Sequence, residues 1–335
     1  MSTRVTMRDV ALAVGVSPMT VSRALRDDDT VRRETREQVQ RAAHELGYVY
    51  DTTAQAFRTQ KSGFVAVSLP SINNANFAET FRGLSDSLTE HGLQLLLGST
   101  GYSVEKEEDL VRQLLARNPE AIVLTGGHHT EQTRKLLMDR KIPIVEMWDL
   151  PDDPIQHVVG FSNSDAMALI VRHLAQSGRR KLAFVGGSDG SDMRGYARRF
   201  GALRAAQDLD LPAPVLIDAG PAPVTMRNGA DIITQWGRDI AQFDALVCVS
   251  DPVAFGCLCA CRRLGLSVPD DLAITGFGNF DLAAVCDPRI TTIGVTARDI
   301  GTRVAALLLD VFEHDTDTSP QTIHVATRLV RGETS

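Results

Sequence analysis

The chain has 335 residues and a formal net charge of −7 at pH 7, with 43% hydrophobic and 23% charged residues. This composition excludes a disordered or fibrous protein, and the length predicts two or three domains. No apolar run is long enough to span a membrane, and the charged N-terminus shows no apolar leader segment. We therefore expect a globular protein that resides in the cytoplasm.

The charge is unevenly distributed along the chain. Residues 1–61 hold 10 Lys and Arg against 8 Asp and Glu, a net charge of +2, whereas the rest holds 25 against 34, a net charge of −9. This balance fits a small nucleic-acid-binding domain on an acidic body. A charge of +2 decides little by itself, because phosphate binding depends on where the charges lie.

Two short helices joined by a tight turn are predicted near the N-terminus. Apolar residues recur at helical spacing up to Val14, and Gly15 marks the end of the first helix. Ser17 is suited to cap a second helix that runs from Pro18 to about Arg26. The pattern is typical of a helix-turn-helix motif whose second helix reads DNA. The alternative is a pair of small helices that only cap a larger core.

A third helix and a polar segment follow. The helix is expected at about residues 33–46, and Gly47 ends it, so that about 50 residues make a minimal DNA-binding domain. Residues 51–63 are polar and end in glycine, which predicts a hinge that orders on binding. Phe57 in this hinge could act as an apolar wedge in the minor groove. The alternative is that Phe57 packs on the next domain.

From Phe64 onward, strand-like apolar runs alternate with helical stretches. The runs begin near residues 64, 93, 121, 143, 181, 215, 245 and 272. This alternation predicts βαβ units with buried parallel sheets, and the number of runs suggests two sheets of similar size.

Ligands bind beyond the carboxyl ends of the strands in such sheets, so the residues that follow the strands are candidates for a binding cleft. They are small, polar and aromatic, which suits a hydroxylated ligand whose carbon skeleton packs on Phe77 or Trp148. The candidates are Ser71, Asn76, Phe77, Thr125, Glu146, Trp148, Ser250, Asp251 and Asn279.

Two features resemble metal sites, but neither predicts one. On a helix, Cys257 and Cys261 share a face while Cys259 points elsewhere, so these and the other two cysteines are interpreted as free structural thiols. The pair His128 and His129 lacks a spaced partner set for zinc and is interpreted as a solvated loop. We expect no metal and no cofactor.

An esterase is a further alternative, because residues 186–190 fit the G-x-S-x-G nucleophile elbow after a strand. The elbow also needs an immediate helix, a base and an oxyanion hole. Ser191 and Asp192 instead prolong the loop, and the histidines that follow in the chain are His314 and His324, near its end. Residues 276–278 lack the third glycine of a dinucleotide site. A loop beside a cleft is therefore favoured, and no catalytic residue is expected.

The chain resembles the lactose/galactose repressor family of bacterial transcription factors over essentially its whole length. Within that family it is most similar to the gluconate repressors. The residues that carry this similarity are Met19, the segment 73–79, Arg82-Gly83, Gly101-Tyr102 and Val145-Glu146. The family resemblance is carried by Asp9-Val10-Ala11, Gly15-Val16-Ser17-x-x-Thr20-Val21-Ser22-Arg23, Leu46-Gly47-Tyr48, Asp251-x-x-Ala254-x-Gly256 and Ile274-x-Gly276-Phe277.

The resemblance implies a small all-α helix-turn-helix domain at residues 1–50, a hinge at 51–63, and a two-lobed α/β body at 64–335. The body would contain doubly wound parallel sheets, like the periplasmic binding proteins. The chain would cross between the lobes three times, with lobe 1 at about 64–160 and 292–322 and lobe 2 at about 161–291 and 323–335. The implied partner is double-stranded operator DNA, bound by a homodimer.

The resemblance also implies site residues. Arg198 matches the effector-binding arginine of the family, and a guanidinium suits a carboxylate through two parallel hydrogen bonds. Gly278 stands where many sugar-binding relatives carry Asp, so a sugar acid such as gluconate is favoured over a neutral sugar. Phe57 departs from the leucine usual in the family. The implied DNA contacts are Thr6, Ser17, Pro18, Met19, Thr20, Ser22, Arg23, Ala54 and Phe57.

Three alternatives follow from the same resemblance. The protein could sense another sugar, it could use its ligand as a corepressor, or it could be a cytoplasmic sugar-binding protein without a DNA role.

Overall fold

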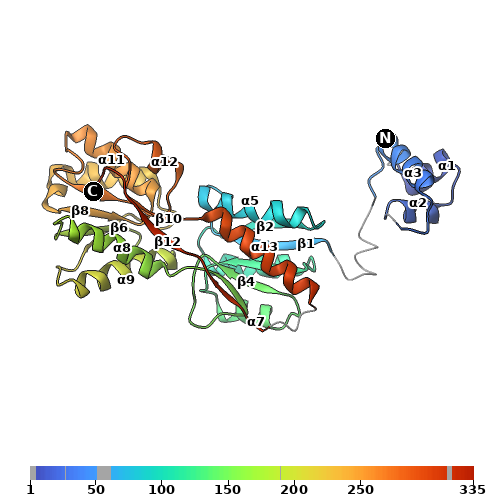
Figure 1. Ribbon diagram of the computed structural model, residues 1–335, viewed down its shortest axis with the longest axis horizontal. Coiled ribbons are helices and arrows are strands. Elements are labelled where there is room, and N and C mark those ends of the chain that lie inside the picture. Colours follow the sequence, from blue (N-terminus) through green and yellow to red (C-terminus); the bar gives the residue numbers. More distant parts are fainter. Residues whose placement is uncertain (1–4, 27, 51–61, 189, 315–318) are drawn as a thin grey trace. The chain divides into compact units, whose positions relative to one another are not determined.

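The computed structural model describes residues 5–26, 28–50, 62–188, 190–314 and 319–335 (Figure 1). The chain divides into two compact units, Met1–Ser62 and Gly63–Ser335, here called the N-terminal unit and the body. None of the helices in the described ranges combines the length and the apolarity that crossing a bilayer requires.

The N-terminal unit consists of α1 (Met7–Val14), α2 (Pro18–Ala24) and α3 (Arg33–Leu46). Its small core is formed by Val10, Val21 and Val39, one from each helix, all fully buried. Ser17 caps α2, because its Oγ accepts a hydrogen bond from the backbone N–H of Thr20 at 3.1 Å. The expected helix-turn-helix is present, with α2 ending two residues earlier than predicted.

The first lobe of the body contains a six-stranded parallel sheet with the order β11-β5-β4-β3-β1-β2. Its strands are β1 (Phe64–Leu69), β2 (Gln94–Ser99), β3 (Ala121–Thr125), β4 (Ile144–Met147), β5 (His157–Gly160) and β11 (Thr322–His324). Its helices are α5 (Ala75–Thr89), α6 (Val104–Leu115), α7 (Glu131–Met138) and α13 (Ala297–Glu313).

The second lobe contains a four-stranded parallel sheet with the order β7-β6-β8-β9. Its strands are β6 (Leu182–Gly186), β7 (Val215–Asp218), β8 (Ala245–Cys248) and β9 (Ala273–Thr275). Its helices are α8 (Asn163–Gln176), α9 (Met193–Asp208), α10 (Met226–Trp236), the 3-10 helix η1 (Gly237–Gln242), α11 (Asp251–Leu264) and α12 (Asp281–Val285).

An antiparallel ribbon of β10 (Thr292–Val295) and β12 (Thr327–Val330) joins the lobes (Figure 1). An isolated bridge between Gly278 and Gly294 connects β10 to the second lobe. β11 pairs with β5, so residues 323 and 324 lie in the first lobe's sheet and the expected boundary at 322 falls inside a strand. The sheets are also unequal, with six and four strands rather than similar numbers. β5 and β11 are too short to show periodicity in the sequence, which explains the difference.

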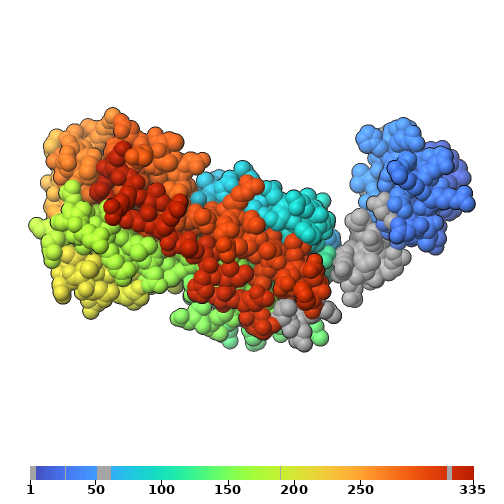
Figure 2. All heavy atoms as spheres, in the orientation of Figure 1, coloured from blue at the N-terminus to red at the C-terminus, as the bar shows by residue number. Residues whose placement is uncertain are grey.

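Helices α5 and α13 lie side by side on the body, as Figure 2 shows in cyan and orange-red. They approach backbone to backbone, because a Cβ at Gly301 would lie 2.0 Å from the carbonyl oxygen of Thr80. The Thr80 hydroxyl donates to the Ala297 carbonyl at 2.9 Å and accepts from the Trp148 indole N–H at 3.1 Å. This helix pair therefore fixes the position of a cavity-lining tryptophan.

The cysteines lie mostly inside the second lobe. Cys248, Cys257 and Cys261 are buried, and all five cysteines are free thiols. Burial raises the pKa of the Cys261 thiol to about 12, so this side chain is uncharged at neutral pH. The buried thiols pack as small apolar groups.

Candidate ligand and nucleic-acid sites

The predicted DNA contacts gather on α2 and its N-terminal turn. The Met19 side chain is 61% exposed, and Pro18 and Arg23 are also exposed. Ser17 and Thr20 contact each other through their hydroxyls at 2.9 Å. These positions form an edge suited to a groove of DNA, on which Thr20 is half-buried and the others are exposed.

Two further predicted contacts already have partners within the N-terminal unit. The Ser22 hydroxyl lies 3.3 Å from the Tyr50 hydroxyl, and the Thr6 hydroxyl donates to Asp9 at 2.7 Å. Ala54 and Phe57 lie outside the described residues.

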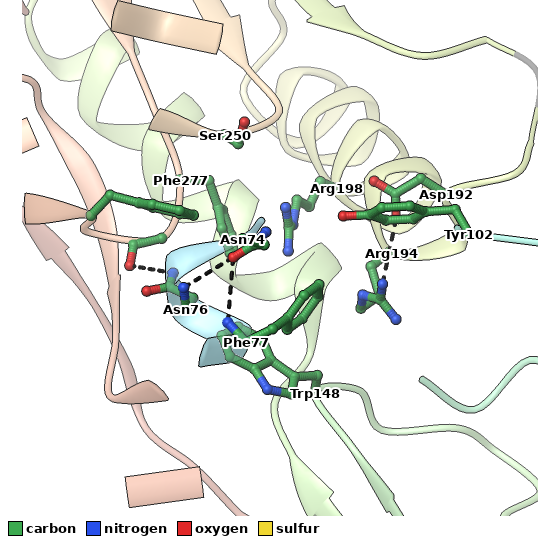
Figure 3. A pocket seen from close by; sticks show the side chains of 12 residues that line it. Asn74, Asn76, Phe77, Tyr102, Trp148, Asp192, Arg194, Arg198, Ser250 and Phe277 are labelled. Atoms are coloured by element: carbon green, nitrogen blue, oxygen red, sulfur yellow. Dashed lines mark hydrogen bonds and ion pairs between the residues drawn. The ribbon is translucent and has the colours of Figure 1, made fainter. Parts of the chain in front are cut away.

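A cavity of about 390 Å³, a volume that includes space open to solvent, lies in the body with walls from both lobes (Figure 3). Five of the predicted effector-binding residues line it: Asn76, Phe77, Trp148, Arg198 and Ser250. The other lining residues are Asn74, Tyr102, Asp192, Arg194, Phe277, Gly278 and Phe280.

Aromatic rings form one wall of this cavity. Phe77 meets Trp148 edge to face, with ring centroids 5.2 Å apart and an interplanar angle of 84°. Trp148 has a φ of 72°, which is unfavourable for a bulky residue. Its backbone is held by a bond from its N–H to the Val159 carbonyl at 3.2 Å and a bond to its carbonyl from Asn163 at 3.1 Å. This wall offers a fixed apolar surface to a ligand.

Arg198 is a cavity-lining cation held by neutral groups. Its Nε donates to the Asn163 side-chain oxygen and its Nη1 to the Val249 carbonyl, both at 2.9 Å. The guanidinium carbon lies 3.8 Å from the centre of the Phe277 ring. In the described part of the chain, no carboxylate forms an ion pair with it. Burial lowers the pKa of Arg198 to about 10, so it remains charged at neutral pH.

Besides the bond from Asn163 to the Trp148 carbonyl, two cavity-lining side chains donate hydrogen bonds from one lobe to the other. Arg194 Nη1 donates to the Thr125 carbonyl at 3.1 Å, and Asn76 Nδ2 donates to the Gly278 carbonyl at 2.9 Å. The Arg194 guanidinium carbon also lies 5.5 Å from the centre of the Phe77 ring. A ligand that enters this cavity therefore meets groups that already connect the lobes.

Several predicted effector contacts lie away from this cavity. The Thr125 hydroxyl donates to the Ser68 carbonyl, and Thr125 lines a neighbouring cavity of about 420 Å³ instead. Ser71 accepts from the backbone N–H of Asn73, and Asn279 is exposed with a φ of 52°.

Asp251 is fully buried and braces the second lobe. Its carboxylate accepts from the Thr292 hydroxyl at 2.5 Å and from the backbone N–H of Phe280 at 2.8 Å. Burial raises the pKa of Asp251 to about 6, against the lowering effect of these hydrogen bonds. Its position supports the cavity wall at Phe280 and does not expose the carboxylate to a ligand.

His129 corrects the prediction of a solvated histidine loop. Its side chain is buried, with Nδ1 2.5 Å from Glu107 Oε1 and Nε2 3.3 Å from Glu146 Oε1. Burial alone lowers the pKa of His129, but the two carboxylates together raise it to about 9. Glu146 is thus a buried ion-pair partner rather than a lining residue of the main cavity. Glu107 is distant in sequence, so spacing could not reveal the cluster.

Sequence reasoning missed Asn74, Tyr102, Asp192 and Arg194. Tyr102 follows β2 and Asp192 precedes α9, so both stand at the sheet edges where ligands bind. Applying the strand-end rule to every strand would have included Tyr102. Arg194 carries no such signal, because it is the second residue of α9, a helix that only the fold directs at the cavity.

The fold and the cavity together define a helix-turn-helix protein with a periplasmic-binding-protein-like body. Residues 6–51 match the bacterial regulatory proteins of the lacI family, and residues 171–335 match a periplasmic binding protein-like domain.

Relatives agree with this assignment. The HTH-type transcriptional regulator GntR of Pseudomonas aeruginosa is 36% identical over 306 residues, which cover 91% of this chain and 89% of the relative. A solved LacI family transcriptional regulator from Silicibacter pomeroyi is 39% identical, with a TM-score of 0.76 over 81% of this chain and 98% of that one. A second regulator from that organism has a TM-score of 0.91 and 28% identity over 98% of this chain and 99% of that one.

The chain belongs to the lacI family of bacterial regulatory proteins. It is a DNA-binding transcriptional regulator and not an enzyme, which overturns the esterase alternative. Ser188 of the G-x-S-x-G segment donates to Asp218 at 2.7 Å. The match at residues 6–51 also overturns a sugar-binding protein without a DNA role.

Proposed function

We propose that this regulator is a homodimeric repressor that an open-chain sugar acid of the gluconate type releases from operator DNA. The observation that carries the proposal is Arg198, a half-buried cation that forms no ion pair within 4 Å with a carboxylate of the described residues, although the charge of Asp192 acts on it at longer range. Isolated buried charges are costly, so a bound anion would stabilise this arrangement. A carboxylate fits a guanidinium through paired hydrogen bonds.

The remaining lining supports a polyhydroxylated carbon chain. Asn74, Asn76 and Ser250 supply amide and hydroxyl groups that both donate and accept hydrogen bonds. Phe77 and Trp148 supply an apolar face for the carbon atoms. An aldonic acid satisfies all three chemistries.

Coupling to DNA requires that the ligand prefer one arrangement of the lobes. The inter-lobe bonds of Arg194 and Asn76 lie in the cavity wall, so a ligand there acts on the contacts that hold the lobes together. The exposed edge of α2 would occupy a half-site of a palindromic operator in each protomer. The expected contribution of Ala54 and Phe57 lies outside the described residues.

Fluorescence anisotropy tests this proposal. The labelled DNA would come from upstream of the protein's own gene and of neighbouring sugar-acid genes, with gluconate as ligand and glucose as the uncharged control. We expect salt-sensitive binding that gluconate, but not glucose, releases. Binding that gluconate leaves unchanged would overturn the proposed effector, and binding that gluconate tightens would identify a corepressor instead.

A further inference from the structure

The ionisable side chains of the main cavity carry an unequal charge. Arg194 and Arg198 are positive, and Asp192 is negative. The lining therefore offers one net positive charge. A ligand with one carboxylate balances it, whereas a ligand with two would leave a buried site with excess negative charge.

Asp192 is the N-cap residue of α9. A Cβ at Gly195 would lie 2.6 Å from Asp192 Oδ2, so a larger residue at that position would displace the carboxylate. The side chain is 24% exposed, and its ion-pair partner is Arg194, with Nη2 4.0 Å from Asp192 Oδ1. At that distance the pairing is weak, and the carboxylate oxygens remain available as acceptors.

Arg198 and Asp192 differ in what they accept. Arg198 lies between Phe277 and Tyr102, and Asp192 lies beside Tyr102 and Arg194 (Figure 3). Asp192 is also the carboxylate whose charge acts most strongly on Arg198, so a ligand carboxylate on Arg198 leaves the rest of the ligand to meet Asp192 in a site that already holds one negative charge. A terminal hydroxyl can donate to the Asp192 carboxylate, but a second carboxylate has no proton to donate and carries the same charge.

The adjoining cavity offers a second carboxylate no better site. Arg194 is shared between the two cavities, and Asp149 and Glu107 add acidic groups beyond it. Among the described lining residues of both cavities there is no lysine and no third arginine. Beyond Arg194, which already faces Asp192, these lining residues offer a second carboxylate no further arginine or lysine.

We infer that Asp192 restricts the effector to a single carboxylate, so that the site takes aldonic acids and rejects the corresponding aldaric acids. The inference rests on the proposed sugar-acid effector and names the residue that limits the net charge this effector can carry. Asp192 thus acts as a specificity-determining residue through direct contact with the ligand.

Isothermal titration of the full-length protein with gluconate and with glucarate, its dicarboxylate counterpart, tests the inference. We expect the wild type to bind glucarate about 100-fold more weakly than gluconate, because like charges would be forced together. Asp192→Asn keeps the shape of the side chain and removes its charge, so the ratio of the two affinities should narrow at least about 10-fold. Asp231→Asn, an exposed position outside both cavities, is the matched control and should keep the wild-type ratio.

The outcomes separate the two claims. Equal binding of both acids by the wild type, or an unchanged ratio in Asp192→Asn, would overturn the role of Asp192 and leave the sugar-acid effector intact. Binding of neither acid would overturn the proposed function and this inference with it.

Discussion

At the scale of single residues, the cavity is built from side chains that are fixed before a ligand arrives. Arg198 is held by Asn163 and Val249 and stacks on Phe277. Fixed donors lose little entropy on binding, so this arrangement would be preorganised for the anion that we propose as effector. The sequence indicated Arg198 and Trp148 as lining residues. It did not indicate that the side chains of Asp251 and Glu146 have buried partners elsewhere and do not line the cavity.

Arg198→Ala should abolish the response to gluconate and leave operator binding intact. Removing one partner of a buried, hydrogen-bonded charge pair costs about 2–5 kcal/mol, so gluconate affinity should fall at least about 30-fold. Titration calorimetry measures the first effect and anisotropy on operator DNA the second. Arg199→Ala, which removes the same charge outside the cavity lining, is the control. Loss of operator binding in Arg198→Ala would show that Arg198 supports the fold instead.

Asp251 should make stability depend on pH. A carboxyl whose pKa is raised on folding stabilises the folded state most at low pH, and this contribution is lost as pH rises through the folded pKa. For Asp251 the pKa rises from 3.8 to about 6. Relative to Asp251→Asn, the wild type should therefore lose up to about 3 kcal/mol of unfolding free energy between about pH 4 and about pH 7.

Urea unfolding across that pH range measures the Asp251 effect. Asp281→Asn, which removes an exposed carboxylate, is the control, and its unfolding free energy should follow the wild-type dependence on pH. Parallel curves for the wild type and Asp251→Asn would contradict the raised pKa.

At the scale of elements, close helix contacts position the cavity. α5 and α13 are far apart in sequence, yet the Thr80 hydroxyl of α5 binds both the first residue of α13 and the Trp148 indole. The sequence predicted the long βαβ alternation, because buried strands read as apolar runs. The short strands β5 and β11 were missed, because three or four residues carry no periodic signal.

Gly301→Ala should destabilise the body. The added methyl would lie 2.0 Å from the Thr80 carbonyl and 2.7 Å from the Leu84 nitrogen, which only a separation of the two helices can relieve. Overpacking of this kind costs about 1–3 kcal/mol. Thermal unfolding measures the loss, with Thr302→Ala on the exposed face of α13 as control. An unchanged melting temperature would show that the helices separate at no cost.

At the scale of the whole molecule, the chain joins a DNA-binding unit to a ligand-binding body, and regulation requires that their binding free energies be coupled. Coupling is reciprocal, so a ligand that weakens DNA binding must itself bind more weakly to the DNA-bound protein by the same factor. The bonds from Arg194 and Asn76 across the lobes are candidates for the contacts that differ between the two states.

Gluconate should therefore bind the operator complex less tightly than the free protein. Typical coupling factors are about 5- to 150-fold. Titration calorimetry with and without saturating operator DNA measures the factor, and a DNA duplex of scrambled sequence is the control. Equal affinity for free and operator-bound protein would rule out release by this ligand.

The sequence by itself determined the helix-turn-helix and the βαβ body. It also identified part of the cavity, because half of the predicted effector-binding residues line it. Those features depend on local periodicity, capping residues and the rule that ligands bind at strand ends, all of which can be read along the chain. Only the tertiary structure decided that His129 is buried between Glu107 and Glu146, and that Asp192 and Arg194 share the cavity with Arg198. The physical reason is that burial and charge pairing depend on contacts between segments far apart in sequence, which the packing of the two lobes creates.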